Sequence, residues 1–144
     1  MDNPPTHIMK RSVEAVYLTI IMKFLHTCYR VVNLEKSVEF YNKALGFSET
    51  RRRDFPEYKF TLVYMALPDS THELELTYNY DHVSYELGNG YSHIAVSVEN
   101  LEAEHEKHKN AGYKVSEMSG LPGAAPMFYF ITDPDGYEIE VIRA

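Results

Sequence analysis

Two stretches of the chain place a histidine seven residues before the tripeptide Asn-Leu-Glu: His26 in HTCYRVVNLE and His93 in HIAVSVENLE. A glutamate follows each histidine at a similar distance, Glu75 after 49 residues and Glu140 after 47. Imidazoles and carboxylates bind divalent metal ions, and a set without thiolate suits an intermediate ion in octahedral geometry. Four protein ligands leave two coordination positions open, which is typical of a catalytic site. These four residues therefore predict a catalytic metal centre.

Each of these residues alone has an ordinary structural explanation. A single histidine in a strand is usually solvated or hydrogen-bonded, and glutamates on an amphipathic strand usually form its solvent face. The pairing carries the prediction, because each pair joins the first strand of a repeated unit to its last. His105 and His108, in EHEKHK, are also spaced to share a metal on a helix, but a solvated helix face is the better interpretation.

The elements that must position these residues form two similar halves. In the first half, Asn33 predicts the cap of a helix over 34–45 that Gly46 ends, and in the second Asn100 predicts the cap of a helix over 101–110. Runs of β-branched and aromatic residues predict the strands around them. The expected strands are 24–32, 47–55, 58–67 and 72–78 in the first half, and 93–98, 113–118, 127–132 and 137–142 in the second.

Side chains alternate between the two faces of a strand, so His26, Cys28 and Arg30 share one face. Glu73, Glu75 and Thr77 lie opposite Leu74 and Leu76 by the same rule, and Glu138 and Glu140 lie opposite Ile139 and Val141. The apolar faces, with Leu25, Tyr29 and Val31, should contact the helices. The polar faces should look into a wet space, either bulk solvent or a cavity formed by the concave side of the sheet, with Cys28 as part of the cavity lining.

The predicted fold class is therefore α+β, with two tandem βαβββ modules over about 24–80 and 91–143. Their curved mixed sheets should form a concave metal site. Each module of about 50 residues is too small to be stable alone, so the modules should bury their sheets against each other or against another chain. We expect a single domain over 23–144, preceded by an N-terminal extension of uncertain status over 1–22.

The composition restricts the function further. The formal net charge of −7 disfavours a nucleic-acid partner, and the longest apolar run near the N-terminus is far short of the roughly 20 residues that span a bilayer. The single cysteine fits a protein of the reducing cytoplasm. The sequence contains no glycine-rich nucleotide-binding motif, so we expect no nucleotide or redox cofactor.

Four motifs of the chain resemble the glyoxalase I (lactoylglutathione lyase) family of the vicinal oxygen chelate superfamily. They are HTCYRV at 26–31, ELTYN at 75–79, GYSHIAVSV at 90–98 and DPDGYEIEVI at 133–142, and the resemblance extends from about 24 to 142. It implies that the metal ligands are His26, Glu75, His93 and Glu140, the set that the internal repeat selects independently.

The resemblance also implies the chemistry. Methylglyoxal and glutathione form a hemithioacetal, which the enzyme isomerises to S-lactoylglutathione by metal-assisted proton transfer through an enediolate. Glu140 is the expected main base, with Glu75 as its counterpart. Arg30 and Asn79 are expected to hold the γ-glutamyl end of glutathione, since an arginine fork binds a carboxylate in bidentate fashion.

Finer expectations follow from the type of family member. Short members with histidine as first ligand imply one Ni²⁺ or Co²⁺ per site rather than Zn²⁺. They also imply a homodimer in which each site takes His26 and Glu75 from one chain and His93 and Glu140 from the other. The chain departs from the family pattern at Ser92, because glycine is common before the third ligand. The segment 118–127, which should border the glycyl end of the thiol substrate, contains no lysine or arginine.

Two alternatives remain open at this point. The first is a metal-dependent relative with other chemistry, such as a ring-cleaving dioxygenase or a thiol transferase acting on fosfomycin. These relatives use two histidines and one carboxylate, so the fourth ligand, Glu75, argues against them. The second is a metal-free drug-binding protein of the same fold, like the bleomycin-resistance proteins, which would have no need of four symmetrically placed ligands.

Overall fold

The structure is a computed structural model, and the fold is described for residues 21–144. The predicted N-terminal extension over 1–22 therefore lies, except for its last two residues, outside the described part of the chain. The elements in chain order are β1 (His26–Arg30), α2 (Leu34–Leu45), β2 (Ser48–Phe55), the 3₁₀ turn η1 (Pro56–Tyr58), β3 (Phe60–Ala66), β4 (Glu73–Asn79), β5 (His93–Val98), α3 (Leu101–Asn110), β6 (Phe128–Thr132) and β7 (Glu138–Arg143).

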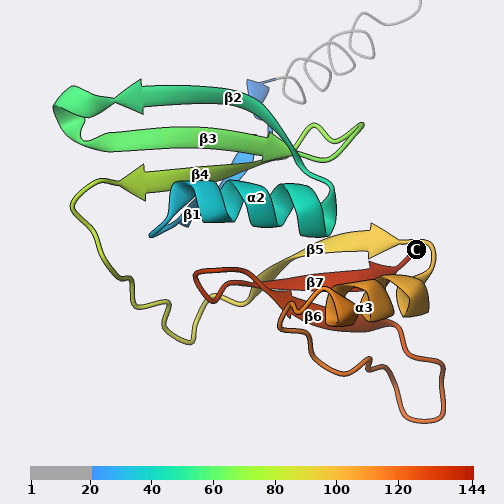
Figure 1. The fold of residues 1–144 in the computed structure, drawn as a ribbon. Helices are drawn as coiled ribbons and strands as arrows, with labels where there is room; N and C mark the ends of the chain where they lie inside the picture. Colours follow the sequence, from blue (N-terminus) through green and yellow to red (C-terminus); the bar gives the residue numbers. More distant parts are fainter. Residues whose placement is uncertain (1–20) are drawn as a thin grey trace, which may run out of the picture.

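The strands form two mixed sheets, each with one helix (Figure 1). The first sheet has the order β1-β4-β3-β2, with β1 parallel to β4 and the other pairs antiparallel. The second sheet has the order β5-β7-β6, with β5 parallel to β7 and β6 antiparallel to β7. In both sheets the first strand of the module therefore lies beside its last strand. The predicted α+β class with two related modules is confirmed.

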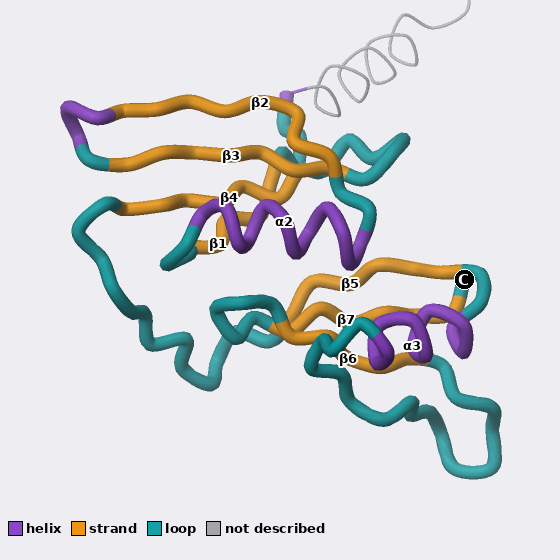
Figure 2. The backbone as a smooth tube through the Cα atoms, viewed as in Figure 1, coloured by secondary structure: helices purple, strands orange, loops and turns teal. Residues whose placement is uncertain are grey.

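One predicted strand, 113–118, is wrong. The chain from α3 to β6 is a long loop (Figure 2), in which only Val115 and Ser119 form isolated bridges to β6. The Ser116 hydroxyl accepts the backbone N–H of Phe130, and the Ser116 carbonyl accepts a hydrogen bond from His105 Nε2 at 2.8 Å. The Ser116 N–H keeps its backbone bond to the Phe130 carbonyl at 2.9 Å, but side-chain bonds replace the ladder bond that the Phe130 N–H would otherwise make, a competition for which serine is well suited.

Both helices begin at the predicted asparagines. The Asn33 side chain accepts from the backbone N–H of Lys36, and the Asn100 side chain accepts from that of Ala103. Gly46 ends α2 with φ of 78°, a conformation that glycine adopts without steric cost. The predicted bounds of both helices are confirmed.

The prediction of a solvated face for His105 and His108 is wrong, because both side chains are buried. Their ring nitrogens bond to a backbone carbonyl or to Tyr129, so burial leaves those polar atoms satisfied. Polar composition alone could not reveal this, since the partners come from the loop after α3, from β6 and from α2.

The core is one continuous cluster to which both modules contribute. The predicted inward residues of the strands are buried: Tyr29, Val31, Leu74, Leu76, Ile139 and Val141. Leu25 precedes β1 and is exposed, contrary to prediction. The Tyr29 ring stacks on Tyr137 with centroids 4.0 Å apart, which joins β1 to the turn before β7. No helix in residues 21–144 is long and apolar enough to cross a membrane.

Candidate metal centre and substrate pocket

The first histidine and glutamate of the repeat lie next to each other on β1 and β4. His26 Nε2 is 3.1 Å from Glu75 Oε2. The parallel register places Glu75 opposite Cys28, two residues beyond His26 on the same face. The Tyr64 ring, on β3 directly opposite Glu75, packs edge-on against the His26 imidazole at 5.8 Å between centroids. The sheet register therefore assembles this pair.

Hydrogen-bond donors surround the Glu75 carboxylate. Thr77, two residues along β4, donates to Glu75 Oε1 at 2.9 Å, and its own oxygen lies 3.3 Å from the Cys28 sulfur. Partial burial would raise the pKa of Glu75, but hydrogen bonds from Tyr64, Thr77 and Cys28 and the nearby His26 outweigh it and lower the pKa. Glu75 is thus held in its ionised form, as a metal ligand must be.

Burial raises the pKa of the Cys28 thiol, partly offset by the hydrogen bond with Thr77, and the Glu75 charge raises it further. Cys28 therefore remains a neutral thiol beside the histidine–glutamate pair.

The second pair has the same arrangement on β5 and β7. His93 Nε2 is 3.5 Å from Glu140 Oε1, and Phe130 on β6, opposite Glu140, packs edge-on against the His93 ring at 5.0 Å. The Ser92 hydroxyl lies 2.5 Å from His93 Nδ1. If Nδ1 carries the proton and donates to Ser92, the Nε2 lone pair is free for a metal ion.

The structure brings the residues together in two pairs, not in one group of four. Among residues 21–144, no group of three or more His, Cys, Asp or Glu side chains is close enough to share a metal ion. The apolar faces of both sheets meet in the common core, so the candidate ligands, which lie on the opposite faces, point outward from it. The described chain therefore presents two separate pairs, each a candidate half-site.

Arg30 and Asn79 lie on the same face of the first sheet as His26 and Glu75. Arg30 is exposed and lines a cavity of about 200 Å³ together with Cys28 and the connection between the modules. Asn79 ends β4, and its side-chain amide donates to the Tyr85 hydroxyl at 3.0 Å. The connection between the sheets thus forms one wall of this cavity and orients Asn79.

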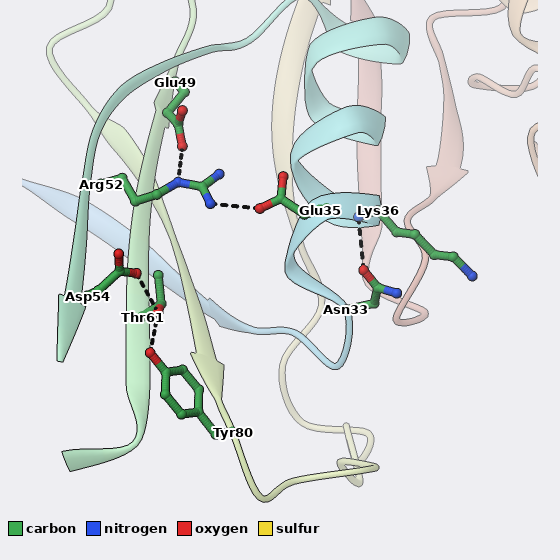
Figure 3. Close-up of polar contacts among 8 residues, drawn as sticks. All are labelled: Asn33, Glu35, Lys36, Glu49, Arg52, Asp54, Thr61 and Tyr80. Carbon is green, nitrogen blue, oxygen red and sulfur yellow. Dashed lines mark hydrogen bonds and ion pairs between the residues drawn. The ribbon is translucent and has the colours of Figure 1, made fainter. Parts of the chain in front are cut away.

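A larger cavity, of about 640 Å³, lies on the other face of the first sheet, beside the N-terminus of α2. Figure 3 shows that its polar side chains are already paired with one another. Arg52 binds Glu35 and Glu49, each at 2.7 Å, and the Thr61 hydroxyl donates to Asp54. The sheet separates this cavity from His26 and Glu75, so its volume does not mark the candidate metal centre.

Sequence reasoning missed the residues that hold the ligands. Thr77 has a local signal, because it follows Glu75 by two residues on one strand, and Ser92 adjoins His93 directly. Tyr64 and Tyr85 have no such signal, since only the strand register and the path of the connection bring them to Glu75 and Asn79.

Comparison with known proteins gives a consistent assignment. Residues 23–141 match the family described as Glyoxalase/Bleomycin resistance protein/Dioxygenase superfamily. The chain is 44% identical to lactoylglutathione lyase of Neisseria meningitidis serogroup A over 125 residues, which cover 85% of this chain and 91% of that protein. It is 42% identical to lactoylglutathione lyase of Escherichia coli O157:H7 over 125 residues, 85% of this chain and 93% of that protein.

Among solved structures, the trypanothione-dependent glyoxalase I of Leishmania major is similar to this chain with a TM-score of 0.77. The two sequences are 35% identical, and the match covers 85% of this chain and 86% of that chain.

Proposed function

The chain belongs to the Glyoxalase/Bleomycin resistance protein/Dioxygenase superfamily and functions as a glyoxalase I, and we propose that it isomerises the hemithioacetal of methylglyoxal and glutathione at a site shared by two protomers. One observation carries the proposal. Two histidine–glutamate pairs occupy equivalent places on the parallel first and last strands of two related modules.

The geometry of each pair fits a divalent metal ion. Two ligand atoms at right angles on one ion, each about 2.1 Å from it, lie about 3.0 Å apart. The nitrogen–oxygen distances of 3.1 Å and 3.5 Å are close to this spacing. His26, Glu75, His93 and Glu140 would hold the ion, which when bound would stabilise the negative charge that develops on the two adjacent substrate oxygens.

The protein's own groups would do the proton transfer and the positioning. Glu140 would remove the proton from the thiol-bearing carbon and return it to the neighbouring carbon, with Glu75 as its counterpart on the other side. Arg30 and Asn79 would hold the γ-glutamyl end of glutathione, Arg30 through its guanidinium fork and Asn79 through the amide that Tyr85 orients. No redox cofactor takes part in this transfer.

The outward direction of the two half-sites supports a homodimer. Two protomers related by a two-fold axis can place His26 and Glu75 of each chain against His93 and Glu140 of its partner, which completes two equivalent sites. Strands β1 and β5, which carry the two histidines, are both edge strands and can approach another chain.

Mixing two inactive variants tests the shared site. One variant carries His26→Ala with Glu75→Gln, and the other carries His93→Ala with Glu140→Gln. The two variants are mixed in equal amounts so that their subunits exchange freely. If the sites are shared, half of the dimers are then heterodimers, and each heterodimer has one intact site of two. Activity should then reach about a quarter of wild type. If each site lies within one chain, every site lacks one pair and the mixture stays inactive, provided that a tag on one variant shows that heterodimers formed.

We propose Ni²⁺ or Co²⁺ as the active ion in preference to Zn²⁺, and glutathione as the thiol. The test is to remove the metal, add back Ni²⁺, Co²⁺, Zn²⁺ or Mg²⁺ separately, and follow thioester formation from methylglyoxal with glutathione or with trypanothione. Activity with Zn²⁺ alone would contradict the metal assignment. Activity with trypanothione alone would contradict the thiol assignment but not the reaction type. The single cysteine, a free thiol, supports a cytoplasmic location.

A further inference from the structure

Three consecutive arginines in β2, Arg51 to Arg53, differ in what neutralises their charge. Arg51 binds Glu73 at 2.6 Å and lies over the Tyr64 ring. Arg52 projects to the opposite side of the sheet, where Glu35 and Glu49 bind it (Figure 3). Within residues 21–144, the ion pairs of β2 do not include Arg53, whose guanidinium lies 5.0 Å from the centroid of the Phe55 ring.

Arg53 lies on the face that carries the first half-site. The sheet register aligns it with Leu62, then with Thr77, and finally with Arg30 on the far edge strand. Directly opposed residues point to the same face, and Thr77 on this row donates to the metal-ligand candidate Glu75. Arg30 and Arg53 thus stand at the two ends of one row across the sheet, about 14 Å apart between Cα atoms at the usual strand spacing.

The surface between and beside these two arginines, on the side away from Glu75, is largely apolar. Phe55, Phe60 and Asn79 form the adjacent row, and the Phe55 and Phe60 rings stack with centroids 4.6 Å apart. The guanidinium of Arg53 extends over the Phe55 ring, at the end of this row that lies farthest from Asn79. An apolar floor with a cation at each end suits an elongated ligand with two negative groups.

We propose that Arg53 binds a carboxylate of the hemithioacetal substrate, at the end of the pocket opposite Arg30. The inference rests on the proposed function. An extended tripeptide spans at most about 10 Å, and the long arginine side chains cover the rest of the distance. The carboxylate can belong to the glycyl end of glutathione or to a 2-oxoaldehyde that carries one, and a planar guanidinium recognises both in the same way.

The test compares wild type, Arg53→Ala and the matched control Arg52→Ala, which removes the same charge from the adjacent residue on the opposite face. Three hemithioacetals are used: methylglyoxal with glutathione, methylglyoxal with the glycyl ethyl ester of glutathione, and a carboxylate-bearing 2-oxoaldehyde with glutathione. Calorimetry with S-methylglutathione and its glycyl ester adds a measurement that does not require turnover. Arg53→Ala should raise KM about tenfold for the substrate whose carboxylate it binds, with kcat nearly unchanged.

The outcomes separate the two sources. If the defect appears with glutathione and vanishes with the ester, in KM and in Kd, Arg53 binds the glycyl carboxylate. If it appears only with the acidic 2-oxoaldehyde, Arg53 binds the aldehyde substituent. If Arg53→Ala loses the same affinity for all three substrates, or behaves like Arg52→Ala, the inference is wrong. The proposed function still stands in that case, provided that the wild type is active. A metallated wild type inactive with every hemithioacetal overturns both.

Discussion

The two half-sites share one geometry and differ in the hydrogen-bond donors around their carboxylates. Glu75 lies opposite Tyr64 and two residues before Thr77, and both hydroxyls bond to it. The equivalent neighbours of Glu140 are Phe130, opposite it on β6, and Ile142, two residues beyond it on β7. These two residues have no hydroxyl. Within residues 21–144, the repeated fold thus gives Glu75 two hydroxyl donors at positions where Glu140 has none.

This difference supports unequal roles for the two glutamates. Donors stabilise the ionised form of a carboxylate and fix its direction, which suits a ligand that stays in place. A carboxylate without such hydrogen bonds is less restrained in position, which suits a base that takes a proton from one carbon and returns it to the next. The comparison therefore favours Glu140 as the base on physical grounds that are independent of the family resemblance.

The largest expected effect is on turnover. At saturating metal, Glu140→Gln should lower kcat about 10³-fold, because the amide cannot accept the substrate proton, whereas Glu75→Gln should lower it only about tenfold. Single-turnover rates of variants with measured metal content give the comparison. A loss for Glu75→Gln equal to or greater than that for Glu140→Gln would assign the base to the other half-site.

The helices of the two modules also differ in how they attach to the core. Helix α2 buries Leu34, Phe40 and Tyr41, whereas α3 buries Leu101 and two histidines. His108 Nε2 donates to the Ala44 carbonyl at 2.7 Å, in the last turn of α2, and His108 Nδ1 lies 2.7 Å from the Tyr129 hydroxyl. One side chain thus satisfies a carbonyl at the end of α2 and joins both modules.

Removal of this link should affect stability more than any surface change in α3. His108→Ala leaves the Ala44 carbonyl and the Tyr129 hydroxyl buried without partners and creates a cavity, so the free energy of unfolding should fall by about 2–4 kcal/mol. Urea unfolding measures it, with the exposed neighbour Lys107→Ala as control. A loss below about 1 kcal/mol would show that water or repacking replaces the histidine.

The sequence predicted what local rules determine. The caps at Asn33 and Asn100 set both helix starts, and strand alternation placed the pairs on outward faces. The prediction failed where residues distant in the sequence determine the structure. The bonds of Ser116 to β6 and to His105 interrupt a predicted strand. His108 is buried because it bonds to the carbonyl of Ala44 in the last turn of α2. Periodicity of one chain also cannot show that the two pairs stay apart within residues 21–144.

The histidines of the half-sites differ as well. Ser92 contacts His93 Nδ1, whereas the residue before His26 is Leu25, which cannot form such a bond. Ser92→Ala should therefore weaken metal binding about tenfold, the usual effect of losing a hydrogen bond to a ligand. Competition with a chelator measures this in the folded protein, and Ser97→Ala on the same strand is the control. Unchanged affinity would mean that the imidazole is positioned by its packing on Phe130.

The smallest expected effect is on acid stability and concerns the donors of Glu75. Its pKa is lowered in the folded protein from the usual 4.5, so the folded state binds this proton more weakly than the unfolded chain. The resulting stabilisation is complete above about pH 4.5 and is lost as the pH falls through the lowered folded-state pKa. Thr77→Val removes one donor and should raise that pKa toward 4.5, so the acid-dependent part of the stability becomes smaller.

The measurement is the urea midpoint of unfolding of the metal-free protein at pH 7, 5, 4 and 3.5. The midpoint should fall less with decreasing pH in Thr77→Val than in wild type, and the control Ser97→Ala should behave like wild type. Ile142→Thr provides the reciprocal change, since it places a hydroxyl two residues after Glu140, as Thr77 stands to Glu75. It should lower kcat, because a hydrogen bond from the new hydroxyl would restrain the Glu140 carboxylate. If the Thr77 variant keeps the wild-type decline and the Ile142 variant keeps the wild-type kcat, the donors do not distinguish the half-sites, and the choice of base must come from the partner chain's surroundings.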